Sequence, residues 1–407
     1  MTSCSRRSTT PRSFRYDRPT VGVTLAYMTL AASLGLGMVM AELRERMHLS
    51  GAITSMHTAF FGWGLVGAGL SGFWIVAHIR RDLLLRMALC GSAMGALIFI
   101  SRERLAFTLL GALVIGVSGA MITMTIPIIL ADHHGEGYAD ALAATNAFPG
   151  LVGMVFPITM GLALSRDWGW RGVFAPFVVS LAAASVLVLG VTRRPAVPAV
   201  EVARTPVTEL LRRRPTRRRW LMLVVAIMVE FGANSWAVAY LREVGGISSG
   251  VATAMFSIIA AGMFAARLAY PAITRGRAPQ RVEGLGFAMT AFGVLLVWGG
   301  PSPVARALGL LVQGLGLAVL YPLGVARLFE CTDADTESLG ALAALASGVA
   351  ITIGPMLIGT LADAIGLRWA FLSMPLVAAF GAFVNLGDRR RWPLTRVGRR
   401  VVPDPPM

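Results

Sequence analysis

The sequence contains no lysine, and charged residues of any kind are scarce. Of its 407 residues, 37 are basic, all of them arginine, and 21 are acidic, so that only 14% of the chain is charged. Soluble domains carry about 25% charged and 45–50% apolar residues, whereas this chain is 56% hydrophobic. The composition excludes an ordinary soluble enzyme. It also excludes a disordered chain, which would require low hydrophobicity.

Cysteine is almost as rare as lysine. Cys4, Cys90 and Cys331 are too few and too far apart in the sequence for a disulfide framework or a cysteine-ligated metal site. The chain also lacks a nucleotide-binding P-loop and the spacing of a catalytic triad, and the adjacent pair His133-His134 is by itself a weak metal signal. We therefore expect no metal, no cofactor and no enzymatic activity.

Hydrophobic blocks of about 20 residues recur along the whole chain, which is the length that an α-helix needs to cross a bilayer. The sequence therefore predicts an all-α integral membrane protein with twelve transmembrane helices. The predicted helices span residues 20–40, 51–76, 83–100, 105–130, 139–164, 172–192, 220–240, 250–272, 283–299, 303–327, 338–362 and 368–386.

Arginines lie between the hydrophobic blocks and in both tails, and they give the chain a net charge of +16. If the N-terminus lies inside, the inner segments hold roughly three times as many arginines as the outer loops. This asymmetry predicts that both termini are cytoplasmic, in the inner (plasma) membrane of a bacterial-type cell. It also explains the positive charge without nucleic acid, so we expect the lipid bilayer and no nucleic acid as a partner.

Two related halves are predicted on either side of the longest connection, which is rich in Pro and Arg. Near residues 141 and 341 the sequence reads ALAA, and Pro157 and Gly161 then correspond to Pro355 and Gly359. Repeated six-helix units are a common transporter design. The predicted divisions are an N-terminal cytoplasmic tail (1–19), an N-terminal six-helix bundle (20–192), a basic cytoplasmic linker (193–219), a C-terminal six-helix bundle (220–386) and a C-terminal cytoplasmic tail (387–407).

Several segments resemble the major facilitator superfamily of secondary transporters. WGWRGVF at 168–174 is similar to the start of the family's helix 6, and GLGLAVLYPLG at 314–324 is similar to its helix 10. EFGANSWAVAYLREVGGIS at 230–248 looks like helix 7 of the fucose-permease-like branch. The resemblance implies two pseudo-symmetric six-helix bundles that work by alternating access. Helices 1, 4, 7 and 10 would line the cavity, and helices 3, 6, 9 and 12 would face lipid.

The loop between the second and third helices departs from the family pattern. Gly72 and the pair Arg80-Arg81 are retained, but Val76 and Ile79 stand where the family usually has Asp and Gly. A conformational latch that depends on that Asp is therefore not expected here. We interpret Arg80 and Arg81 as structural charges.

Glu230 is the most conspicuous residue, because it lies about 15 Å into a predicted membrane helix. A charge at that depth costs about 3 kcal/mol on insertion scales, so such a residue faces a cavity, finds a partner or stays protonated. Glu230 and Asn234, one turn later, would form a proton-coupling or substrate-binding patch. The alternative is a structural carboxylate tied to Arg267 or to helix ends, and we expect Arg267 itself to be structural.

The N-terminal half contains no carboxylate in the middle of a predicted helix. Further candidates for lining a cavity are polar residues in the predicted spans of both halves. They are Tyr27, His57, Asn146, Gln313 and Tyr321.

The resulting hypothesis is a secondary active transporter, or permease, for a small organic solute. It would use alternating access with a monomer as the transport unit, and protons are a candidate coupling ion. Uptake and efflux both remain open, as does the choice between symport, antiport and uniport. The alternative of a different class is a non-transporting membrane sensor or assembly protein built on the same fold.

Overall fold

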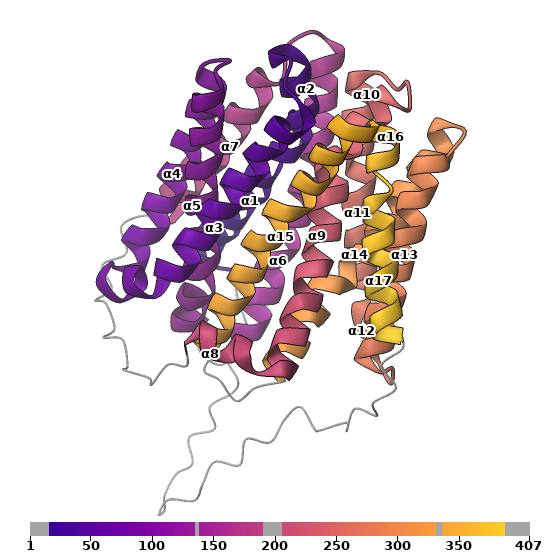
Figure 1. Cartoon of the computed structure of the whole chain (residues 1–407). Coiled ribbons are helices and arrows are strands. Elements are labelled where there is room, and N and C mark those ends of the chain that lie inside the picture. The colour runs from indigo at the N-terminus through magenta and orange to yellow at the C-terminus, as the bar shows by residue number, and fades with distance from the viewer. Residues whose placement is uncertain (1–15, 135–137, 190–205, 331–335, 387–407) are drawn as a thin grey trace, which may run out of the picture.

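The computed structural model describes residues 16–134, 138–189, 206–330 and 336–386, and within these ranges every regular element is an α-helix. Figure 1 shows the helices side by side in one elongated bundle. The first half contains α1 (Arg18–Leu34), α2 (Leu36–Met47), α3 (Gly51–His78), α4 (Arg81–Ser101), α5 (Leu105–His134), α6 (Tyr138–Ser165) and α7 (Arg171–Leu189).

The second half begins with a short helix, α8, that precedes the long α9. It contains α8 (Val207–Arg212), α9 (Arg214–Glu243), α10 (Ser249–Met255), α11 (Ser257–Leu268), α12 (Tyr270–Thr274), α13 (Pro279–Gly299), α14 (Pro303–Glu330), α15 (Thr336–Ile365), α16 (Leu367–Ala370) and α17 (Ser373–Leu386). We call the end of the bundle where α1 begins and α17 stops the lower end, and the opposite end, with α2 and α10, the upper end (Figure 1).

Eleven helical segments among the described residues are long and apolar enough to cross a membrane, with α1–α2, α10–α11 and α16–α17 each counting as one segment. The 28-residue helix α3 is not among these eleven segments. It nevertheless runs through the bundle, packed against α5 and α15. The arrangement is consistent with the predicted twelve-helix fold.

Large apolar side chains are exposed on α4, α7, α13 and α17. These helices occupy the third, sixth, ninth and twelfth positions of the predicted order, the positions expected to face lipid. Exposed apolar surface on this scale suits hydrocarbon rather than water. Examples are Met94, Leu187, Phe292 and Phe383.

The two halves meet along two antiparallel helix pairs, α3 with α15 and α6 with α10–α11. Glycines allow the close approach. A Cβ on Gly51 would lie 2.4 Å from the Gly359 carbonyl oxygen, and one on Gly161 would lie 2.4 Å from the Gly250 carbonyl oxygen. Side chains at these positions would push the halves apart.

The internal repeat is visible in the helix contacts themselves. Gly64 of α3 approaches the backbone of Leu113 in α5, and 198 positions later Gly262 of α11 approaches the backbone of Leu311 in α14. The contact between α4 and α5 at Gly95 and Gly111 likewise recurs between α13 and α14 at Gly293 and Gly309, again 198 positions later. The two bundles therefore share their packing and not only short sequence motifs.

Several helix boundaries differ from the predicted ones. The helix α9 begins at Arg214 rather than at Trp220, so the arginines at 217–219 belong to its first turns. Residues 206–212, expected in the linker, contain the short helix α8. The rest of the predicted linker, 193–205, and nearly all of the two predicted tails lie outside the described residues. The division into domains therefore stays a prediction.

A buried charge cluster joins three helices of the second half near the lower end. Arg327 of α14 forms an ion pair with Glu283 of α13, and its Nη1 donates a hydrogen bond of 2.6 Å to Asn385 of α17. The side chains of Arg327 and Glu283 are 3% and 1% exposed. The sequence placed both residues at predicted helix ends. The structure extends both helices and buries the pair.

Candidate functional site

Two polar residues on α9 lie together because of how this helix packs. Gly232 faces α15, where a Cβ would lie 3.3 Å from the Gly354 backbone. Residues two positions before or after Gly232 point about 200° away from it around the helix. Glu230 and Asn234 therefore share the face of α9 opposite to Gly232. Both are half-buried. The close contact on one side of α9 thus orients its polar side chains away from α15.

Asn234 and Gln313 connect α9 to α14. The Gln313 Nε2 donates a hydrogen bond of 2.9 Å to the Asn234 Oδ1. Gln313 is fully buried, and its Oε1 has no hydrogen-bond partner in the structure. A buried acceptor without a partner costs about 1–3 kcal/mol. It therefore provides a position at which a donor group of a bound solute would be stabilised.

Glu230 forms no hydrogen bond and no ion pair with any residue that the structure describes. The charge of Arg267 on α11 acts on it from outside the ion-pair distance. Tyr321 of α14 interacts electrostatically with Glu230, and its hydroxyl interacts with that of Ser347 on α15. Tyr321 is 41% exposed despite these interior neighbours. We infer that its open surface lies inside the bundle.

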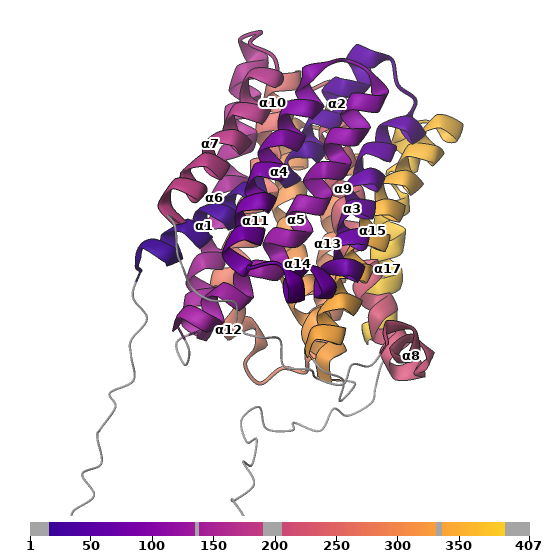
Figure 2. The same ribbon diagram turned by 90° about the vertical axis from the view of Figure 1, so that its left-hand side faces the viewer.

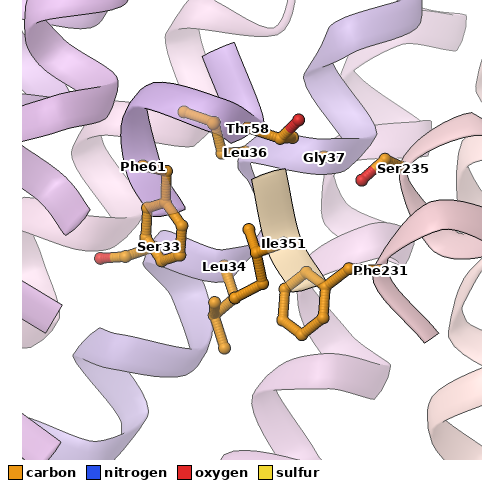
Figure 3. A pocket seen from close by; sticks show the side chains of 9 residues that line it. All are labelled: Ser33, Leu34, Leu36, Gly37, Thr58, Phe61, Phe231, Ser235 and Ile351. Atoms are coloured by element: carbon orange, nitrogen blue, oxygen red, sulfur yellow. The ribbon is translucent and has the colours of Figure 1, made fainter. Parts of the chain in front are cut away.

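A small pocket lies beside this cluster and is formed by both halves. Figure 3 shows side chains from α1, α2 and α3 facing side chains from α9 and α15. The first half provides Ser33, Leu34, Leu36, Gly37, Thr58 and Phe61, and the second half provides Phe231, Ser235 and Ile351. Phe231 and Ser235 are the next residues along α9 after Glu230 and Asn234.

The wall of this pocket contains the break between α1 and α2. Gly35 separates the two helices, and its N–H bonds to the carbonyls of Ala32 and Ser33 instead of continuing the α-helical pattern. A Cβ on Gly35 would lie 2.3 Å from the Phe156 ring, which excludes a larger residue here. Broken helices at mid-membrane supply backbone polar groups to ligand sites in transporters.

Ion pairs close the upper end above the pocket, and they join the two halves. Arg44 of α2 pairs with Glu243 of α9 at 2.6 Å, while Arg242 of α9 pairs with Glu42 at 3.2 Å and with Glu45, both on α2. Together these residues form what we call the upper ion-pair cluster. Figure 2 shows α2 at the upper end, in front of the second half.

A carboxylate of the second half also caps a helix of the first. Asp363 of α15 accepts hydrogen bonds from the backbone N–H groups of Gly51, at 2.6 Å, and Ala52, at 2.9 Å. A negative charge at a helix N-terminus is favourable. This cap therefore adds to the closure of the upper end.

Three predicted cavity residues lie elsewhere. His57 is fully buried, with its Nε2 2.8 Å from the Thr108 hydroxyl of α5. Tyr27 is 8% exposed within an apolar cluster of the first half. Asn146 is exposed and donates to the Leu142 carbonyl of its own helix. The structure thus brings together Glu230, Asn234, Gln313 and Tyr321 but not these three.

The predicted structural charges lie near the lower end. Arg80 pairs with Asp82 at 2.9 Å, and Arg81 pairs with Asp132 of α5. Arg267 is exposed near the end of α11.

Sequence reasoning missed the pocket residues Thr58 and Phe61 and the partner residue Ser347. Thr58 and Phe61 are ordinary residues of membrane helices, and only the tertiary fold sets them apart. Gly35 was a weaker signal that could have been noticed, since Leu34-Gly35-Leu36-Gly37 places two glycines in the middle of a predicted span.

Comparison with known proteins agrees with this architecture. The family model of the Major Facilitator Superfamily matches residues 20–282. A mutant form of the nucleoside transporter NupG superposes with a TM-score of 0.75 at 12% identity, covering 90% of this chain and 99% of that one. A bacterial homologue of the human lysosomal transporter Spinster, in an inward-facing and unoccupied conformation, superposes with a TM-score of 0.70 at 15% identity, covering 90% and 96%.

The match to the family model covers more than half of the sequence, and the structural likeness covers nearly all of it. The chain is a multi-pass membrane protein of the transporter type, and it belongs to the Major Facilitator Superfamily. The predicted fold class, all-α with two related bundles, is confirmed. At identities of 12% and 15%, the likeness to the solved structures shows a shared fold and nothing more specific.

Proposed function

We propose that this protein is a secondary active transporter that carries a small organic solute by alternating access, coupled to protons through Glu230. The observation that carries the proposal is the cluster of Glu230, Asn234, Gln313 and Tyr321, next to a pocket built from both halves. This chemistry is that of a binding site, with one acid, two amides and a hydroxyl, and we propose no enzymatic activity.

The surroundings of Glu230 support proton coupling. A carboxylate in a membrane helix without an ion-pair partner gains or loses a proton more readily than one tied into a salt bridge. Solute that binds to the adjacent amides changes the access of water to this carboxylate. Binding and protonation would then influence each other, as symport or antiport requires.

The arginine distribution supports an orientation with both termini in the cytoplasm. In that orientation the upper end faces outward, and the upper ion-pair cluster closes the outer entrance. We propose that the structure corresponds to a state closed to the outside, with a monomer as the transport unit in the inner membrane.

The test begins by finding a solute. Thermal unfolding of the purified protein is followed against a panel of small organic compounds that includes nucleosides, since the structurally similar NupG is a nucleoside transporter. A ligand that binds the folded state raises the unfolding temperature. Uptake of a positive compound into proteoliposomes, with and without a pH gradient, then measures transport directly.

Glu230→Gln removes the titratable group while keeping its size. We expect solute binding to remain within about tenfold of the native protein, since a glutamine still accepts a hydrogen bond. The stimulation of transport by a pH gradient should disappear. Glu209→Gln is the matched control, because Glu209 is an exposed carboxylate on α8 paired with Arg213.

Unchanged pH dependence in Glu230→Gln would refute the coupling role. Binding of a solute without any uptake by the native protein would instead favour the sensor or assembly protein with the same fold.

A further inference from the structure

Three potential metal ligands converge at the lower end of the first half, far from the site described above. Asp17 precedes α1, while His133 and His134 end α5. One ligand atom from each of the three lies within 4.8 Å of the other two, and all three residues are half-buried. The two imidazole rings have their centroids 4.7 Å apart. Residues 116 positions apart in the sequence thus form a compact group.

The bonds within this group leave one carboxylate oxygen for the histidines. The Asp17 Oδ1 accepts hydrogen bonds from the Thr20 backbone N–H at 3.1 Å and from the Thr20 hydroxyl at 2.6 Å, and so caps α1. The Asp17 Oδ2 faces the His133 Nε2 instead. The His134 Nε2 lies 2.8 Å from the Thr20 hydroxyl. An ion could bind the Oδ2 without breaking the helix cap.

The nearest arginine in the sequence is directed elsewhere. The Arg18 Nε donates a hydrogen bond of 2.8 Å to the Val188 carbonyl, and its Nη2 donates one of 3.3 Å to the Leu187 carbonyl, both at the end of α7. These bonds hold the guanidinium of Arg18 at α7, so that it does not fill the space between Asp17 and the histidines.

We propose that Asp17, His133 and His134 form a binding site for a divalent transition-metal ion, with Zn²⁺ as the best match. Two imidazoles and one carboxylate are a common zinc ligand set, with metal–ligand distances of about 2.0–2.2 Å. The three ligand atoms all lie within 4.8 Å of one another, so a single ion could lie among them once the side chains rotate toward it. A water molecule would complete a tetrahedral shell. Ca²⁺ and Mg²⁺ fit less well, because they prefer oxygen ligands alone.

Such an ion would connect the start of α1 to the end of α5. Both helices belong to the first half, so the ion would stabilise this half without blocking movement between the halves. The proposal is independent of solute transport and goes beyond the proposed function.

The test uses the full-length protein purified in detergent with a tag that contains no histidine. Zn²⁺ is titrated in competition with a chromogenic chelator, and thermal unfolding is recorded with and without Zn²⁺. We expect one Zn²⁺ per chain and a higher unfolding temperature with the ion. In His133→Gln and His134→Gln the affinity should fall by about tenfold or more, and the stabilisation by Zn²⁺ should be lost.

Two further variants make the result specific. Asp17→Asn keeps a good helix cap but removes the anionic ligand, so it should unfold at the native temperature without Zn²⁺ and bind the ion weakly. His48→Asn, at the upper end, should bind Zn²⁺ as the native protein does. The proposal is overturned if the native protein binds no stoichiometric Zn²⁺, or if both His133→Gln and His134→Gln bind it with native affinity. Because neither readout involves solute, failure here leaves the transport proposal untouched.

Discussion

At the scale of single residues, two acids in helices of the second half contrast with each other. Glu283 is paired with Arg327, whereas Glu230 has no ion-pair partner among the described residues. Glu230 could be recognised from the sequence, because it stands alone in the middle of an apolar block. Glu283 could not, since it and Arg327 stand at the predicted ends of two helices, and the sequence does not show that these ends extend and pair with each other.

Removing one partner of the buried pair Glu283–Arg327 should strongly lower the stability of the second half. Glu283→Gln leaves the Arg327 charge uncompensated, and breaking a buried ion pair costs about 3–5 kcal/mol. We expect a clearly lower unfolding temperature for the purified variant.

Replacing both partners is the matched control. Glu283→Met combined with Arg327→Met removes both charges, and such replacements are often close to neutral. The double variant should therefore unfold at a higher temperature than Glu283→Gln. Equal destabilisation of the two would show that the charge pair is not the cause.

At the scale of elements, the helices were predictable from hydrophobic length, and their pairing was not. Each membrane helix carries apolar residues on several sides, so the pattern does not indicate which neighbour lies on which side. Glycine contacts such as that of Gly62 with Gly348 decide the pairing of α3 with α15, and glycine is too frequent here, at 45 residues, to be informative alone.

Substitutions at two glycines of α3 test the close packing of α3 against α15. A Cβ on Gly62 would lie 2.9 Å from the Gly348 carbonyl oxygen and 2.8 Å from the Thr352 hydroxyl oxygen, whereas one on Gly67 would meet nothing within 4 Å. Gly62→Val should destabilise the protein by about 1–3 kcal/mol, the usual cost of overpacking, and should slow transport. Gly67→Val should be close to native in both assays. If the two variants behave alike, close approach of α3 and α15 is not required.

At the scale of the whole molecule, the order of the helices and the relation between the halves followed from the sequence repeat. The closure of the upper end did not, because the upper ion-pair cluster joins residues about 200 positions apart, such as Arg44 and Glu243. Charges in predicted outer loops could be identified, but their partners depend on how the halves are oriented.

Breaking the upper ion-pair cluster should open the pocket to the upper side. Arg242→Ala removes ion pairs to Glu42 and Glu45, each worth up to about 1 kcal/mol. In a protein with its native cysteines replaced by serine, Ser235→Cys reports on the pocket, since Ser235 is only 7% exposed. Its labelling by a membrane-impermeant thiol reagent from the upper side should become about tenfold faster.

Arg213→Ala in the same background is the control, since this arginine pairs with Glu209 on neighbouring α8 at the lower end. It should leave the labelling rate of Ser235→Cys unchanged. An equal rate in Arg242→Ala and the native background would mean that the upper ion-pair cluster does not hold the entrance shut.

The 198-residue repeat has a consequence for where a solute resides during transport. Ile115 of α5 packs against Gly95 as Gln313 of α14 packs against Gly293, so an apolar residue stands in one half where the other half has an amide. Glu230, Asn234 and Tyr321 belong to the same half as Gln313. The polar groups that the proposed function assigns to solute binding are therefore unequally divided between two bundles with the same helix packing. We expect the solute to remain bound to the second half during transport, while the first half moves relative to both.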